Sequence, residues 1–195
     1  MKKKEWKQFV PFYFYTPLTL GVTVAAMMSE ARSFGSILFL CFTGIATWGL
    51  VEYVLHRSVF HFDARSEKGR QFVYTMHLAH HAQPKALEDL FASLFLSLPI
   101  AFVYCMLAWA LTGSWQVMAY LFSGLTAGYF SYEFLHYQAH HGAPRLLLFR
   151  YLKKYHLLHH HQTPNLRFGV TSPVFDYLFG TFRSTHSVAS RGSSS

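Results

Sequence analysis

The chain has 195 residues, of which only 13% are charged, whereas 52% are hydrophobic and 18% are aromatic. Soluble domains are about one quarter charged, so this composition excludes a disordered chain and argues against a conventional water-facing surface. The formal net charge of +8 could suggest nucleic-acid binding, but the basic residues flank long apolar runs, so we expect a membrane and no nucleic acid. Cys41 and Cys105 both lie inside apolar runs, a placement that supports neither a disulfide framework nor a zinc ribbon.

Four apolar stretches are each long enough to cross a membrane, which takes about 20 residues of helix. Residues 90–132 form 43 consecutive residues without a formal charge, a length that suits two helices separated by a Thr-Gly-Ser turn. We therefore expect an all-α, polytopic membrane protein with four transmembrane helices in two hairpins and a cytoplasmic, histidine-rich, metal-binding cap. The expected spans are residues 9–29, 34–51 with an apolar extension to Leu55, 90–111 and 115–136.

Lys and Arg concentrate on one side of these spans, which predicts the orientation of the chain. Sixteen of the 17 lie in residues 1–8, 56–89 and 137–195, and the exception is Arg32. Both termini are therefore expected to be cytoplasmic. The basic start and the first apolar run could instead be a cleaved signal peptide, but the run contains two prolines and bulky aromatics without a clear cleavage site.

No linker, repeat or second domain is visible, so we expect one integral-membrane domain over residues 1–187. Residues 188–195 are rich in Ser and are expected to form a disordered tail. The short chain and its Lys-rich start favour a bacterial inner membrane over the endoplasmic reticulum.

All 13 histidines lie in, or at the border of, the expected cytoplasmic segments 56–89 and 137–195. Residues three and four apart share a helix face, so the histidines of HLAHH (77–81) can point at one metal centre, and so can His156, His159 and His160. His136 and His140 are one turn apart. His56 and His61 are about 140° apart on a helix, so they converge only if the helix ends or bends, or else they serve different metals.

A single histidine in such a place is usually an interfacial or hydrogen-bonding residue, and this is our interpretation of His186. Ten histidines in four repeated spacings are instead typical of metal ligation. Ten are too many for one ion, whereas five for each of two ions suits a two-metal centre. Nitrogen ligands without cysteine favour iron, zinc or copper over magnesium or calcium.

Glu52 lies one turn before His56 and Glu133 three residues before His136, and Asp176 is a weaker candidate of the same kind. Carboxylates near a membrane border are costly unless they are paired. We expect each to accept the ring N–H of a ligand histidine and so to fix its tautomer. The alternative is a salt bridge, for example with Arg57 or Arg145.

At five motifs the chain resembles the fatty acid hydroxylase superfamily of integral-membrane, non-haem di-iron enzymes, and it is most similar to the fatty acid 2-hydroxylases. The motifs are WGLVEYVLHRSVFH (48–61), HLAHH (77–81), SYEFLHYQAHHG (131–142), KYHLLHHH (154–161) and FGVTSPVFDYLFGT (168–181). The resemblance places the metal ligands at His56, His61, His77, His80, His81, His136, His140, His156, His159 and His160. His141 and His161 are extra histidines that are not expected to be ligands.

The resemblance implies an O2-dependent hydroxylase that acts on the acyl chain of a membrane lipid or fatty acid, at C2 near the head group. Its cofactors would be two iron ions. Zinc could occupy the same ligands, but it has no redox chemistry. Segment 168–181 would pack against the metal core and help seat the head group. Only eight residues precede the first apolar run, so a separate electron donor is expected: cytochrome b5, a ferredoxin or a reductase.

Three alternatives remain open from the sequence. A carotenoid or sterol-type hydroxylase or desaturase shares the histidine motifs. A haem-binding electron-transfer membrane protein would use histidine pairs as axial ligands, but it does not explain the HxxHH repeats. A metal transporter needs polar ligands along its spans, which these spans lack.

Overall fold

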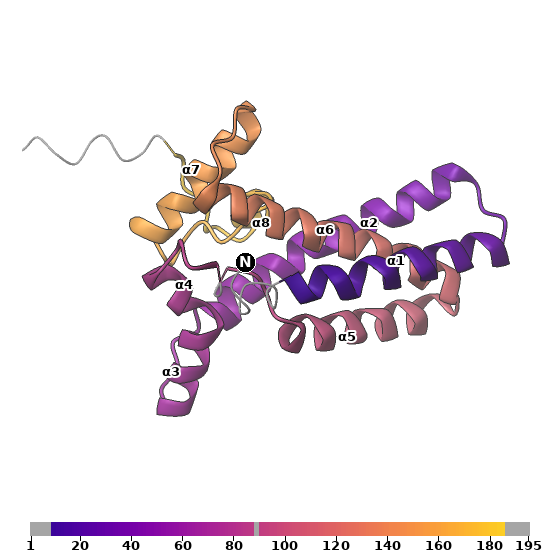
Figure 1. Ribbon diagram of the computed structural model, residues 1–195, viewed down its shortest axis with the longest axis horizontal. Coiled ribbons are helices and arrows are strands. Elements are labelled where there is room, and N and C mark those ends of the chain that lie inside the picture. The colour runs from indigo at the N-terminus through magenta and orange to yellow at the C-terminus, as the bar shows by residue number, and fades with distance from the viewer. Residues whose placement is uncertain (1–8, 88–89, 186–195) are drawn as a thin grey trace, which may run out of the picture. The chain divides into compact units, whose positions relative to one another are not determined.

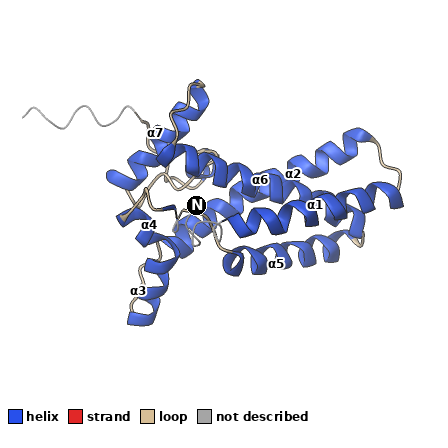
Figure 2. Cartoon of the chain, in the orientation of Figure 1, coloured by secondary structure: helices blue, strands red, loops and turns tan. Residues whose placement is uncertain are grey.

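The computed structural model describes residues 9–87 and 90–185, and within these ranges every regular element is a helix (Figure 2). This confirms the all-α prediction for the described part of the chain. The chain divides into two compact units, Met1–Trp48 with Phe91–Glu133 and Gly49–Leu90 with Phe134–Ser195. The expected tail at 188–195 and His186 lie outside the described residues.

The first unit contains α1 (Val10–Ser29), α5 (Leu94–Thr112) and the first parts of α2 (Phe34–Leu55) and α6 (Trp115–His141). Helices α1, α5 and the beginning of α6 run side by side (Figure 1). Gly113 ends α5 with φ of 64°, a left-handed conformation that glycine adopts without a steric penalty. The turn expected between the third and fourth spans therefore lies where the sequence predicts it.

Three helical segments are long and apolar enough to cross a membrane: Val10–Ser29, Phe34–Phe60 and Leu94–Thr112. They indicate a multi-pass membrane protein. Helix α6 has 27 residues and contains the fourth expected span, but it is not among these candidates. Its many Ser, Thr, Gly and Tyr residues, together with Glu133, dilute its apolar character. The four-span arrangement thus stays a prediction.

Two glycines allow α2 and α6 to approach closely in the first unit. A Cβ atom on Gly124 would lie 2.0 Å from the carbonyl oxygen of Cys41, and one on Gly44 would lie 2.2 Å from that of Leu121. Small residues permit such close backbone contact between membrane helices. Helix α1 joins α6 through hydroxyl groups, since Thr23 Oγ1 and Ser123 Oγ are 2.6 Å apart.

The second unit consists of short helices, the ends of α2 and α6, and one longer helix. Its elements are a π-helical turn η2 (His56–Phe60), α3 (Glu67–Val73), a π-helical turn η3 (Tyr74–Leu78), α4 (Ala79–Ala82), α7 (Leu147–His161) and α8 (Val174–Leu178). Ser66 caps α3 by accepting a hydrogen bond from the backbone N–H of Gly69. Helix α7 buries Leu152, Tyr155, His156 and His159, whose spacing of three and four residues makes one continuous face. The buried face of α7 therefore carries histidines.

Candidate metal centre

Ten histidines of the second unit come together in two groups of five. Within each group, one nitrogen from every ring lies within 4.8 Å of all the others. The first group is His56, His61, His77, His81 and His159, and the second is His80, His136, His140, His156 and His160. These are the ten histidines expected from the resemblance. His141 and His161 belong to neither group.

The grouping corrects one expectation, because the histidines of one HxxHH cluster do not point at one centre. In each cluster the i and i+4 histidines share a group, whereas the i+3 histidine joins the other group. On a helix, residue i+3 lies about 60° to one side of residue i and residue i+4 about 40° to the other side, so the two side chains diverge. The i, i+4 pairs are His77 with His81 and His156 with His160, and the i+3 residues are His80 and His159.

His56 and His61 meet in one group because the chain between them is a π-helical turn. The backbone N–H of His61 donates to the carbonyl oxygen of His56 over 3.2 Å, which is the i to i+5 bond of a π-helix. This wider turn brings residues five apart towards one face, and the helix ends at His61. From the sequence, His56 and His61 converge only if the helix ends or bends, and this condition is met.

The facing nitrogens of these rings are spaced as ligands of one ion would be. In the first group, His77 Nε2 lies 3.0 Å from the Nε2 atoms of both His56 and His81. In the second, the Nε2 atoms of His80 and His136 are 2.9 Å apart. Two nitrogens bound at right angles to a metal at about 2.1 Å would be separated by about 3.0 Å. Each group could thus hold a metal ion.

In two rings, a backbone carbonyl binds Nδ1, the ring nitrogen other than the Nε2 that faces the group. His56 Nδ1 lies 2.5 Å from the carbonyl oxygen of Phe168, and His159 Nδ1 lies 2.8 Å from that of Leu166. Because a carbonyl can only accept, each Nδ1 carries the hydrogen and donates it. The Nε2 lone pair of each ring is then free to point into the first group, as a metal ligand requires.

Glu52 binds the loop that orients these rings, whereas the sequence predicts that it binds a ring directly. Its carboxylate accepts hydrogen bonds from the backbone N–H of Val170 at 2.5 Å and from the backbone N–H and hydroxyl of Thr171 at 3.0 and 2.5 Å. The expected bond to a histidine ring is therefore wrong for Glu52. A buried loop with unpaired N–H groups needs acceptors, and the carboxylate supplies them. Glu52 also forms none of the alternative salt bridges with the described residues, and Arg57 donates to the hydroxyl of Tyr53 at 2.7 Å instead.

Asp176 binds the same loop, and the prediction that it accepts a histidine N–H is wrong in the same way. Its two oxygens accept the backbone N–H groups of Phe168 at 2.8 Å and Gly169 at 2.7 Å, and Oδ1 also accepts the hydroxyl of Thr181. Glu133 belongs to the first unit, where it accepts the backbone N–H of Ala92 at 2.9 Å. Its expected bond to a histidine stays a prediction.

Arg167 is a buried residue of this loop that the sequence does not single out. It lies between Leu166 and Phe168, whose carbonyls hold the two histidine rings, and its φ of 62° is left-handed. Its guanidinium donates to the carbonyl oxygens of Arg183 at 3.2 Å and Ser184 at 3.1 Å. The guanidinium also donates to the hydroxyl of Thr163. A lone arginine in a turn carries no sequence signal for such a role, because most of its partners are backbone atoms.

The aromatic ring of Phe168 packs directly on the first group. Its centroid lies 5.6 Å from the ring centroids of His56, His61 and His159. This confirms that segment 168–181 packs against the histidine core.

Burial keeps the histidine rings neutral. It lowers the pKa of His80 and His81 to about 3 and that of His61 and His140 to about 4, because charged imidazolium loses its hydration inside the protein. Neutral imidazole is the form that binds a metal, so these sites are ready for one at neutral pH.

A helical membrane chain with two groups of five histidines defines a class: histidine-rich membrane proteins whose histidines could hold metal ions. The chain matches the sequence profile of the family described as "Fatty acid hydroxylase" over residues 41–181. It is 34% identical over 157 residues to Arabidopsis thaliana "Dihydroceramide fatty acyl 2-hydroxylase FAH2", covering 78% of this chain and 64% of that protein. The chain belongs to the fatty acid hydroxylase family.

Two further similarities agree with this assignment. The chain is 37% identical over 158 residues to Saccharomyces cerevisiae "Ceramide very long chain fatty acid hydroxylase SCS7", covering 74% of this chain and 39% of that protein. A solved structure described as "Full length scs7p (only hydroxylase domain visible)" aligns with a TM-score of 0.81 and 30% identity, covering 93% of this chain and 67% of that one. The chain thus spans from about two fifths to about two thirds of the length of these relatives.

Proposed function

We propose that this chain is an O2-dependent hydroxylase of the acyl chain of a membrane lipid or fatty acid, acting at C2 next to the head group. The observation that carries the proposal is the pair of five-histidine groups, whose members coincide with the ten ligands that the family resemblance implies. The relatives are named as hydroxylases of a fatty acyl chain or a very long chain fatty acid, which supports an acyl substrate over a carotenoid or sterol.

Two iron ions fit the residues present. Both ring nitrogens of His160, in the second group, are buried without a hydrogen-bond partner in the described part of the chain. Buried polar atoms are rarely left unpaired, and a metal would pair one of them. Bound iron supplies the redox chemistry by which O2, two electrons and two protons convert a C–H bond to C–OH and water. Zinc could occupy the same nitrogens without supporting that chemistry.

The chain's own residues have three tasks in this proposal. The ten histidines hold the metals with neutral nitrogens, and the loop around Arg167 keeps His56 and His159 turned inward. Phe168 covers one face of the first group and so excludes water from it. The histidine groups would also direct the metals at C2, the carbon next to the head group of the lipid.

The topology belongs to the same proposal. One domain over residues 1–187 would cross the membrane four times, with α6 as the fourth span and both termini cytoplasmic. The Lys and Arg distribution supports this orientation, and a bacterial inner membrane is the favoured location. The electron donor would be a separate protein.

Lipid mass spectrometry of cells with and without the protein tests the activity. Expression should produce 2-hydroxy fatty acids, free or in complex lipids, and His80→Ala should abolish them while His141→Ala retains part of the yield. Oxygenated lipids hydroxylated elsewhere on the chain would overturn the C2 assignment. Absence of any oxygenated lipid from cells whose protein carries both metals would overturn the proposed function.

A further inference from the structure

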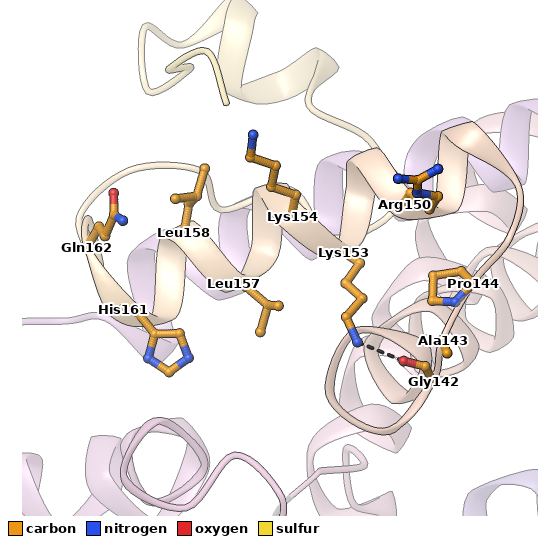
Figure 3. A pocket seen from close by; sticks show the side chains of 10 residues that line it. All are labelled: Gly142, Ala143, Pro144, Arg150, Lys153, Lys154, Leu157, Leu158, His161 and Gln162. Atoms are coloured by element: carbon orange, nitrogen blue, oxygen red, sulfur yellow. Dashed lines mark hydrogen bonds between the residues drawn. The ribbon is translucent and has the colours of Figure 1, made fainter. Parts of the chain in front are cut away.

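A cavity of about 670 Å³ lies between α7 and the loop that follows α6 (Figure 3). We call it the α7 pocket, and its charged or titratable lining residues are Arg150, Lys153, Lys154 and His161. All of its lining residues fall in the second unit, which also holds the histidine groups. None of the ten grouped histidines lines this pocket.

Among the described residues, no carboxylate forms an ion pair with the positive side chains of the α7 pocket. Residues 134–175 contain no Asp or Glu at all. Lys153 reaches across to the loop and donates to the carbonyl oxygen of Gly142 at 2.7 Å, a partner without charge (Figure 3). Arg150 and Lys154 are exposed and form no ion pair in the described residues. A concave site with three permanent positive charges attracts an anionic partner.

The α7 pocket also adjoins the second histidine group. The ring of His161, on its wall, has its centroid 6.1 Å from that of His160, which belongs to that group. The pocket is therefore within electrostatic reach of one of the two candidate metal positions.

We propose that the α7 pocket is the docking site for an acidic one-electron carrier protein that reduces the centre through the second histidine group. The proposal rests on the proposed function, which consumes two electrons for each C–H bond hydroxylated: R–H + O2 + 2e⁻ + 2H⁺ gives R–OH + H2O. Two carrier molecules would each be oxidised by one electron. Electron transfer slows steeply with distance, so a carrier has to dock close to the metals.

A protein fits this site better than an anionic membrane surface does. The positive side chains line a shallow, open pocket together with Leu157 and Leu158, so a partner meets positive charge and an apolar contact at one place. Complementary charge around an apolar contact is also how transient protein complexes form quickly and in the correct orientation.

The experiment measures electron delivery to the full-length, metal-loaded protein in nanodiscs. Stopped-flow spectroscopy follows oxidation of a reduced, soluble cytochrome b5 haem domain, whose acidic surface provides the probe. The double variant R150E/K154E should slow the second-order rate at least ten-fold at low ionic strength and weaken its dependence on salt. The matched control R65E/K68E changes the same charge at exposed positions outside the pocket and should stay within about two-fold of wild type.

Equal rates for R150E/K154E and wild type, with metal content intact in both, would overturn the docking site. A slowing seen only in nanodiscs that contain phosphatidylglycerol would show that the pocket faces anionic lipid, which also overturns it. The proposed function is tested separately with wild-type protein that dithionite reduces chemically, so that no carrier protein is needed. If it binds both metals and still forms no hydroxylated lipid, the proposed function fails whatever the docking result.

Discussion

The carboxylate of Glu52, near the end of α2, accepts a hydrogen bond from the backbone N–H of Val170, with 2.5 Å between the two atoms. The two residues are 118 positions apart in sequence. This bond fixes a loop whose carbonyl groups turn the rings of His56 and His159 inward. A residue that belongs to neither histidine group thereby determines where two ring nitrogens point.

Replacing Glu52 should therefore weaken metal binding although every histidine stays in place. Glu52→Ala removes the acceptor for three hydrogen bonds, and we expect metal affinity to fall by about 10- to 100-fold, as changes behind a metal ligand usually cause. Glu52→Gln keeps one oxygen for the two backbone N–H groups, so its effect should be smaller. Metal titration of the purified variants measures both, and an unchanged affinity for Glu52→Ala would contradict the role of the loop.

The division of the histidines predicts which metal each substitution affects. His159→Ala removes a nitrogen from the first group, and His80→Ala removes one from the second. Each single variant should bind fewer than two metals per chain and lose hydroxylation, and the double variant should bind fewer still. Elemental analysis checks this against His141→Ala, whose exposed ring stacks on Tyr137 and belongs to neither group. Two metals retained by both single variants would refute the assignment.

Acid should destabilise the metal-free protein. The folded-state pKa values of about 4 for His61 and His140 and about 3 for His80 and His81 lie below the ordinary value of 6.5. As the pH falls below about 6.5, the unfolded chain takes up protons before the folded chain does, so the free energy of unfolding decreases. The loss should continue to about pH 4 to 3, where the folded rings also protonate. Thermal unfolding of stripped protein between pH 8 and 5 measures it, and a flat profile would contradict the burial of these rings.

The close contact between α2 and α6 predicts a stability effect in the unit that does not hold the histidine groups. Gly124→Ala would place its Cβ against the backbone of Cys41, which cannot move without shifting a helix. Overpacking of this kind typically costs about 1–3 kcal/mol of unfolding free energy. Gly21→Ala is the control, because nothing lies within 4 Å of its added Cβ. Denaturation in matched detergent should show a lower midpoint for Gly124→Ala alone.

Much of the candidate site is predictable from residue spacing and motif content. Histidines three and four apart on short segments predict ligation, and the resemblance selects the ten that the structure gathers, with His141 and His161 left aside. Apolar runs predict the helices, and Gly113 ends α5 within the expected turn. These features are predictable because they depend on residues close in sequence, through helical geometry or a local φ preference.

The assignment of each histidine to a group required the tertiary structure. Whether His80 turns towards His81 or towards His136 depends on which helices lie on either side of α4, and a local pattern does not encode that. The same is true of Glu52 and Asp176, which accept mainly from backbone N–H groups in residues 168–171. Backbone N–H groups are nearly the same in every sequence, and for Glu52 the nearest of them is 118 positions away.

The sequence by itself determined that this is a helical membrane chain with ten histidines suited to metals, because composition and short-range spacing act within one helical turn. Only the tertiary structure decided that HxxHH clusters split between two groups, that a π-helical turn joins His56 to His61, and that carboxylates hold a loop and not a ring. Those outcomes depend on packing between segments up to more than a hundred residues apart, where burial forces each polar group to find whichever partner the fold brings within reach.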